Sequence, residues 1–255
     1  MSKRKQQTEL AGATLSEFEG VRYLHLGSPW VQGAMRLRKP QALELDYIQR
    51  MMAWMLWRPQ AEVSAGHAVQ LGLGAASITR FCHQTMAMRC TAVEINLSVI
   101  LACRLWFALP DDSPRLQVVE ADAGAWVRQP QHAGSAEVLC VDLYDDDAAA
   151  PVLDDEVFYA ACQRLLAPGG LMAVNLFGRD ASLARSSARI AVAFGADQVW
   201  QLTPTKEGNT VVIAAKGVQV PDRETLTARA QAIEARFGLP ARRWLRMVKP
   251  WQPVA

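Results

Sequence analysis

Four apolar segments of this sequence lead into glycines or carboxylates, the residue types that a small-molecule site needs. In chain order these residues are Gly72 and Gly74, Glu94, Asp122, and Asp142 with Asp145. Each follows or ends a stretch that is expected to be a buried parallel strand. Because the carboxyl ends of parallel strands meet at one edge of a sheet, these residues are expected to line one site.

The first two segments have the spacing of a nucleoside-binding strand–helix–strand unit. Gly72 and Gly74 bracket a turn where the backbone can bend sharply and a ligand can come close. Glu94 ends the next strand, where a carboxylate can accept both hydroxyls of a ribose. The full G-x-G-x-x-G pattern of dinucleotide sites is absent because position 77 is serine. The spacing therefore favours a nucleoside without a pyrophosphate, such as S-adenosylmethionine, over NAD or FAD. The alternative is a purely structural turn.

Asp142 is the candidate catalytic residue. Displacement at a carbon attached to a sulfonium releases a neutral thioether, so the enzyme must supply alignment and an unprotonated nucleophile. A free alkylamine has a pKa of about 10. A carboxylate beside the amine can take its proton or hold its lone pair in line. The acidic run 145–147 that follows would attract polycations, although Asp146 and Asp147 also fit a solvated loop.

The elements that must position these residues alternate between strands and helices. This order predicts an α/β fold with a mostly parallel sheet and helices on both faces. Seven strands are expected, at residues 67–73, 91–95, 116–120, 136–143, 171–177, 198–202 and 210–215. Only seven residues separate the last two, which predicts an antiparallel hairpin. Ser77 is the expected cap of the helix after the first strand.

The chain is expected to divide into four parts. These are a flexible tail (1–16), a small β piece with a helix at 43–57 (17–60), the nucleoside-binding α/β domain (61–220), and a C-terminal helix with a basic tail (221–255). The tail carries several arginines and two tryptophans, and it is expected to be a surface extension.

Composition limits the classes of partner. The 255 residues include 27 basic and 25 acidic side chains, a balance that demands neither a nucleic acid nor a membrane as partner. Five cysteines without a C-x-x-C pair are expected to be buried free thiols in a reducing compartment, the cytoplasm. The four histidines lack metal-ligand spacing, so no metal is expected. The polar, basic start predicts no signal peptide.

Several segments resemble the spermidine synthase (polyamine aminopropyltransferase) family. They are GLGAASITRF, TAVEI, RLQVVEADAGAW, VLCVDLYD and FYAACQRLLAPGGLMAVN. The resemblance covers residues 22–216 and is strongest over 72–175. It implies the seven-stranded class I methyltransferase-like (Rossmann-like) fold. It also implies transfer of the aminopropyl group of decarboxylated S-adenosylmethionine to an amine acceptor such as putrescine.

The resemblance also implies roles for residues on the nucleoside side. Glu94 matches the acidic residue that holds the ribose. Asp122, which is followed by Ala123, matches the aspartate that meets the adenine amino group. Gly72 and Gly74 match glycines of the family's glycine-rich motif.

On the amine side, Asp142 and Asp145 match a D-x-x-D pair. The first aspartate of that pair helps to deprotonate the attacking amine and the second binds it. Gln32 and Tyr47 match residues that the family places around the two substrates.

Two departures from the family pattern concern charge. Ala75 stands where the family has an aspartate that grips the ammonium of the aminopropyl group, and Gln49 stands where a glutamate is frequent. Intact S-adenosylmethionine therefore stays open as the co-substrate. The alternative functions are methyl transfer from S-adenosylmethionine and non-catalytic binding of a nucleoside on the same fold. The expected partner is a small-molecule amine, with no nucleic acid and no membrane, and a homodimer is possible.

Overall fold

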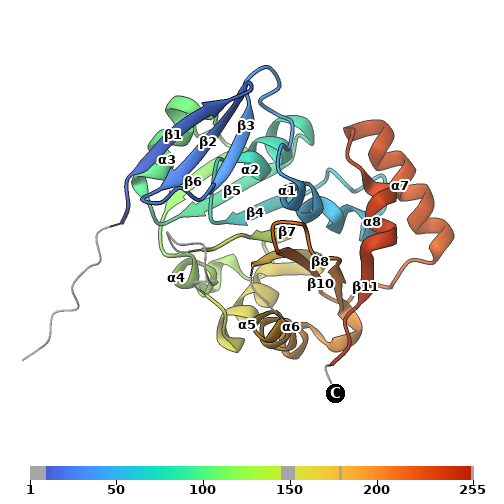
Figure 1. Cartoon of the computed structure of the whole chain (residues 1–255). Helices are drawn as coiled ribbons and strands as arrows, with labels where there is room; N and C mark the ends of the chain where they lie inside the picture. The colour runs from blue at the N-terminus through green and yellow to red at the C-terminus, as the bar shows by residue number, and fades with distance from the viewer. Residues whose placement is uncertain (1–9, 145–152, 178–179, 254–255) are drawn as a thin grey trace, which may run out of the picture.

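An eight-stranded sheet runs through the centre of the computed structural model, which describes residues 10–144, 153–177 and 180–253 (Figure 1). The strand order is β11-β9-β10-β8-β7-β4-β5-β6. The strands are β4 (His67–Leu71), β5 (Arg89–Glu94), β6 (Leu116–Glu120), β7 (Ala136–Val141), β8 (Leu166–Phe177), β9 (Val199–Leu202), β10 (Asn209–Ala215) and β11 (Val248–Pro250). Strands β4 to β8 pair in parallel, whereas β10 pairs antiparallel with both β8 and β9. The seven predicted strands and the hairpin are confirmed, and β11 is an addition.

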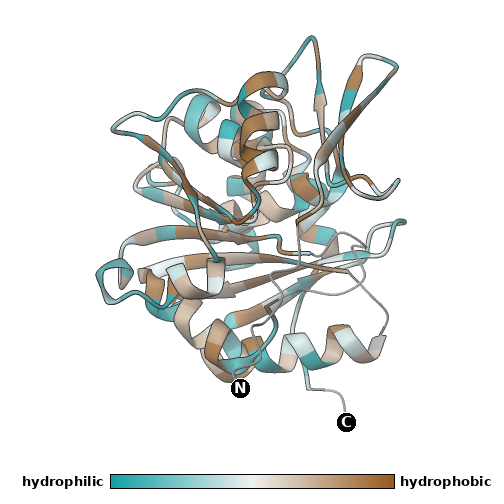
Figure 2. Ribbon diagram, turned by 90° about the vertical axis from the view of Figure 1, so that its left-hand side faces the viewer, coloured by the Kyte–Doolittle hydropathy of each residue, from teal (hydrophilic) through white to brown (hydrophobic). Residues whose placement is uncertain are grey.

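Helices cover both faces of this sheet, as predicted. One face carries α2 (Ser77–Arg80), α3 (Leu97–Trp106), α7 (Arg223–Phe237) and α8 (Ala241–Met247). The other carries α4 (Ala123–Val127), α5 (Glu156–Leu165) and α6 (Asp180–Phe194). Figure 2 shows apolar stretches along the strands and on the helices that flank them, and the buried residues form two clusters. Each face of the sheet thus has its own apolar cluster, because side chains of a strand alternate between the faces.

A small antiparallel sheet precedes the main one. It consists of β1 (Ala13–Phe18), β2 (Val21–Leu26) and β3 (Gly33–Arg36) in that order. Residues 1–9 of the expected flexible tail lie outside the described residues, but residues 13–16, which were also expected in that tail, belong to β1. Their partner is β2, and the turn between the two strands places both Glu19 and Gly20 at positive φ. Positive φ is uncommon for a residue other than glycine, so the sequence does not indicate that Glu19 takes part in this turn.

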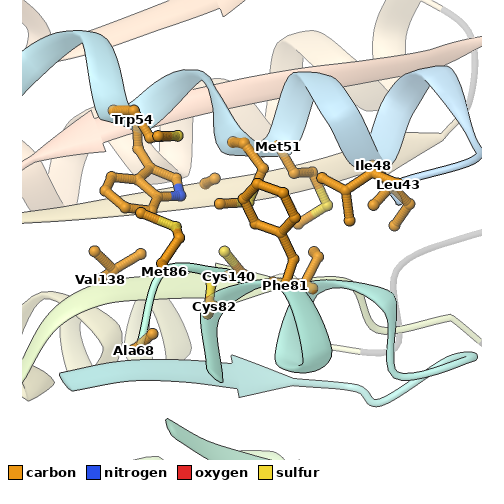
Figure 3. Packing of buried hydrophobic residues seen from close by; sticks show 14 of the residues in the cluster. Leu43, Ile48, Met51, Trp54, Ala68, Phe81, Cys82, Met86, Val138 and Cys140 are labelled. Carbon is orange, nitrogen blue, oxygen red and sulfur yellow. The ribbon is translucent and has the colours of Figure 1, made fainter. Parts of the chain in front are cut away.

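The predicted helix at 43–57 has two parts. It is α-helical over α1 (Asp46–Met51) and 3-10 helical over η1 (Met52–Trp57), and all six residues of η1 are buried. In Figure 3, Ile48, Met51 and Trp54 of this segment face Phe81 and Met86 of the segment that follows β4. One apolar core thus joins the N-terminal piece to the main sheet.

The C-terminal tail is not a surface extension. Trp244 of α8 is 1% exposed, and β11 pairs with β9 at the edge of the sheet. The prediction was wrong because the basic residues of α8 alternate with buried ones. Arg242 and Arg243 face solvent, while Ala241 and Trp244 enter the core.

The cysteines match the expectation, since all five are free and buried. Within the part of the chain that the structure describes, no helix is both long and apolar enough to cross a membrane.

We expect Trp244→Ala to lower the free energy of unfolding by about 3–5 kcal/mol, the usual cost of removing a buried aromatic ring. Urea unfolding followed by circular dichroism measures this change. Arg243→Ala on the same helix is the control and should alter stability by less than about 0.5 kcal/mol. Similar effects of the two substitutions would contradict a core role for Trp244.

Candidate active site

A cavity of about 640 Å³ lies at the carboxyl ends of the central strands. It is walled by the small sheet, by α1 and by the turns after β4, β5 and β7. All but one of the site residues predicted from the sequence line it: Gln32, Tyr47, Gly72, Gly74, Glu94, Asp122, Ala123 and Asp142. Asp145 falls outside the described residues. The predicted meeting of strand ends at one site therefore holds for Gly72, Gly74, Glu94, Asp122 and Asp142.

Gly72 is the point where the turn after β4 meets β7. Its φ is +83°, and a Cβ at this position would lie 2.1 Å from the carbonyl oxygen of Asp142. The amide of Asp142 donates to the carbonyl of Leu71 at 2.9 Å. Only glycine allows so close an approach, and it sets the glycine turn directly against the candidate catalytic residue.

Glu94 crosses from the end of β5 to this same turn. Its Oε2 accepts a hydrogen bond from the amide of Leu73 at 2.8 Å, and its Oε1 accepts one from the amide of Asn96 at 2.9 Å. Burial raises the pKa of Glu94, while these amides oppose the rise. A carboxylate offers about four acceptor positions, so each oxygen can still accept from a ligand hydroxyl.

Asp122 has a structural partner as well as a place in the cavity. It is the N-cap of α4, and its Oδ1 accepts from the amide of Ala125 at 2.6 Å. Ala123 follows as the first residue of α4 and is 6% exposed. This cap fixes the position of a carboxylate that lines the cavity.

Asp142 is held between two donors that come from different elements, Tyr47 of α1 and Asn175 of β8. Its Oδ2 accepts from the hydroxyl of Tyr47 at 3.2 Å, and its Oδ1 accepts from Nδ2 of Asn175 at 2.9 Å. Burial raises the pKa of Asp142 to about 6, although both hydrogen bonds act to lower it. The pKa of Tyr47 is raised by burial and by the Asp142 carboxylate, so its hydroxyl remains a donor.

Two asparagines of this wall were missed in the sequence analysis. Asn175 lies near the end of β8, and its Oδ1 accepts from Nδ2 of Asn209 at 3.2 Å. Both asparagines line the cavity. A polar residue inside the apolar run 171–177 was the available signal, but its contact with Asp142 depends on the neighbouring positions of β7, β8 and β10.

Ala75 does not face the cavity as the sequence suggested. It is 2% exposed and is covered by β3, because a Cβ on Gly33 would lie 2.6 Å from the Cβ of Ala75. Gln49 also points elsewhere, and its side-chain amide donates to the carbonyl of Leu43 at 2.8 Å. The two departures from the family pattern are therefore both engaged in packing.

The helix after the glycine turn has no side-chain cap, so the expectation for Ser77 was wrong. Ala76 is the N-cap, with a left-handed φ of 57°, and Ser77 is already helical. The hydroxyl of Ser77 donates to the carbonyl of Ala34 at 3.0 Å. It ties the helix to β3 instead.

Arg80 supports the turn from beneath. Its guanidinium is fully buried and donates to the carbonyls of Ala75 at 2.5 Å, Phe107 at 2.6 Å and Pro40 at 3.1 Å. Burial lowers the pKa of Arg80 to about 10, so the side chain stays cationic at neutral pH. Three chain segments meet at this one side chain.

Among the described residues, no group of histidine, cysteine, aspartate or glutamate side chains is arranged to hold a metal ion.

The side-chain amide nitrogen of Gln32 is buried and has no hydrogen-bond partner within the described ranges.

The fold is shared with solved structures of two enzyme classes. A probable spermidine synthase from Corynebacterium glutamicum has a TM-score of 0.71 at 21% identity, over 91% of this chain and 90% of that one. Human methyltransferase-like protein 13, in complex with SAH, has a TM-score of 0.66 at 22% identity, over 82% and 96%. A spermidine synthase in complex with the transition-state analogue AdoDATO has a TM-score of 0.57 at 16% identity, over 89% and 87%. These likenesses confirm the predicted methyltransferase-like fold.

Sequence comparison is more specific, although no protein-family model matches the chain. The chain is 33% identical over 227 residues to the polyamine aminopropyltransferase of Chromobacterium violaceum, covering 88% of this chain and 84% of that protein. It is 30% identical over 241 residues to the polyamine aminopropyltransferase of Neisseria meningitidis, covering 94% and 89%. With such identity along nearly the whole length of both proteins, this chain belongs to the polyamine aminopropyltransferase family.

Proposed function

We propose that this enzyme transfers the aminopropyl group of decarboxylated S-adenosylmethionine to an amine such as putrescine, with Asp142 as the general base. The observation that carries the proposal is the Asp142 carboxylate, held by Tyr47 and Asn175 in the cavity and directly beside the glycine turn. A homodimer and a cytoplasmic location stay predictions.

The nucleoside of the donor would lie along the turns after β4, β5 and β6. Glu94 would accept the ribose hydroxyls, and Asp122 with Ala123 would meet the adenine edge. Gly72 and Gly74 would let the sulfonium end approach the backbone. This placement leaves the carbon next to the sulfur facing Asp142, because Gly72 and Asp142 are in contact.

The reaction is an in-line displacement. The amine lone pair forms the new C–N bond while the C–S bond breaks, and the bonding electrons stay on sulfur as a neutral thioether. The proton of the amine passes to Asp142. Burial raises the pKa of Asp142 and brings it closer to the pKa of an amine. A carboxylate with a higher pKa is a stronger base, so the proton transfer is favoured. Asp145 would bind the amine, as the family pattern implies.

Methyl transfer from intact S-adenosylmethionine is the second candidate. The same nucleoside contacts would serve either donor, and the fold is common to both enzyme classes. The products distinguish them. Aminopropyl transfer yields methylthioadenosine and methyl transfer yields S-adenosylhomocysteine, which mass spectrometry of the reaction mixture separates.

We expect Asp142→Asn to lower turnover with decarboxylated S-adenosylmethionine and putrescine by about 10²–10⁴-fold, the range for a positioned general base. Methylthioadenosine affinity should change much less. Product formation by mass spectrometry and binding by calorimetry measure the two quantities. The exposed Asp111→Asn serves as the matched control, and wild-type turnover in Asp142→Asn would sink the assigned role.

The pH dependence follows from the same carboxylate. With both substrates saturating, turnover should fall as the pH drops below about 6, where Asp142 becomes protonated. Tyr47→Phe removes a hydrogen bond that stabilises the carboxylate, so it should move this acidic limb to higher pH. Profiles of turnover from pH 5 to 9 measure the shift. A limb that stays in place in Tyr47→Phe would argue against Asp142 as the titrating group.

We expect Glu94→Ala to weaken methylthioadenosine binding by about 1.5–3 kcal/mol, the range for hydrogen bonds to a charged group. Titration calorimetry measures the change. Glu120→Ala is the control, because Glu120 is the register partner of Glu94 on β6 and is exposed. Unchanged affinity in Glu94→Ala would show that the ribose lies elsewhere.

A further inference from the structure

Three carboxylates on the cavity wall have no role in the reaction as described: Glu44, Asp46 and Glu207. Two of them are neutralised by arginines. Arg36 pairs with Glu44 at 2.5 Å, and Arg50 pairs with Asp46 at 2.6 Å. Glu207 is exposed and has no ion pair or hydrogen bond among the described residues. Its negative charge is therefore available to a ligand.

The turn between β9 and β10 holds Glu207 in a defined place. The amide of Thr205 donates to the carbonyl of Asn209 at 2.8 Å, and the amide of Gly208 donates to the carbonyl of Thr205 at 3.2 Å. Thr205 is itself 6% exposed. Gly208 has a φ of +99°, and a Cβ there would lie 3.3 Å from the ring of Phe177. The turn is thus packed against the end of β8.

The same turn is connected to the proposed base. Asn209 donates to Asn175, and Asn175 donates to Asp142, at 3.2 and 2.9 Å. Asn209 lies on β10, Asn175 lies on β8, and Asp142 directly follows β7; these three strands are consecutive in the sheet. Two strand spacings of roughly 4.8 Å each separate the backbones of β7 and β10, a distance on the order of 10 Å. Glu207 stands two residues before Asn209, in the turn that leads into β10. A short alkyl diamine spans such a gap when each of its nitrogens lies about 3 Å from a carboxylate.

We propose that Glu207 binds the second, non-reacting ammonium of the acceptor and so makes the enzyme select diamines over monoamines. The inference rests on the proposed aminopropyl transfer and names the acceptor class. Phe177 lines the cavity and ends β8, the strand between β7 and β10, so it would contact the alkyl chain. Because Ala75 and Gln49 contribute no charge to the cavity, Glu207 supplies a negative charge from a different element of the fold.

The test compares 1,4-diaminobutane with n-butylamine, which has the same reacting amine and chain length but lacks the second ammonium. Glu207→Gln should lower kcat/KM for the diamine by at least about tenfold, or about 1.4 kcal/mol, mainly through KM. For butylamine it should change kcat/KM by less than about twofold. Glu207→Asp keeps the charge and should lose less than Glu207→Gln. The exposed Glu224→Gln on α7 is the control and should leave both amines unaffected.

The possible failures are distinguishable. If the wild type uses the diamine and Glu207→Gln uses it equally well, or loses both amines to the same extent, the role of Glu207 is overturned while the proposed function stands. If the wild type transfers an aminopropyl group to neither amine, the proposed function fails and the inference fails with it.

Discussion

The close contact between Gly72 and Asp142 is the constraint on which the site depends. A side chain at position 72 would overlap the carbonyl oxygen of Asp142, so β4 and β7 can adjoin at their carboxyl ends only with glycine there. That contact brings the glycine turn and a buried carboxylate together at the ends of neighbouring parallel strands. The strands on either side of this pair extend the cavity wall, with Glu94 of β5 and Asp122 after β6 on one side and Asn175 of β8 and Asn209 of β10 on the other.

Two buried groups that can carry opposite charges, Arg80 and Asp142, lie near the glycine turn. Arg80 has no carboxylate partner in the described ranges and donates to backbone carbonyls from three segments. Such hydrogen bonds offset part of the cost of removing a charge from water. Asp142 is also buried, the part of the chain that the structure describes gives it two side-chain donors, and burial raises its pKa. The Arg80 environment is that of a structural cation, whereas the Asp142 environment leaves a proton acceptor incompletely satisfied.

The sequence predicts the strands and the residues at their ends because both follow from local patterns. Apolar runs mark the strands, and Gly72, Glu94, Asp122 and Asp142 stand where those runs stop. The partners of these residues are harder to predict. Tyr47 is 95 positions from Asp142 and was identified only through the family resemblance.

Contacts that depend on strand order lie beyond local patterns. The asparagines behind Asp142 meet it only because β8 and β10 follow β7 in the sheet. The orientation of Ala75 is set by β3, which comes from a separate sheet. The burial of Trp244 likewise depends on where α8 packs against the core. The basic residues around it in the sequence instead suggest a solvent-exposed segment.

The outer edge of the sheet has a bearing on how the protein behaves when concentrated. An edge strand presents unpaired backbone groups that can recruit a strand of another molecule, a route to aggregation. Here β11 covers β9 and becomes the edge itself. It is only three residues long, it carries the exposed Lys249, and it ends at Pro250, which has no amide hydrogen to donate. A short, charged and donor-poor edge is a poor template for a further strand. The last strand of the described chain, β11, thus disfavours β-pairing with another molecule.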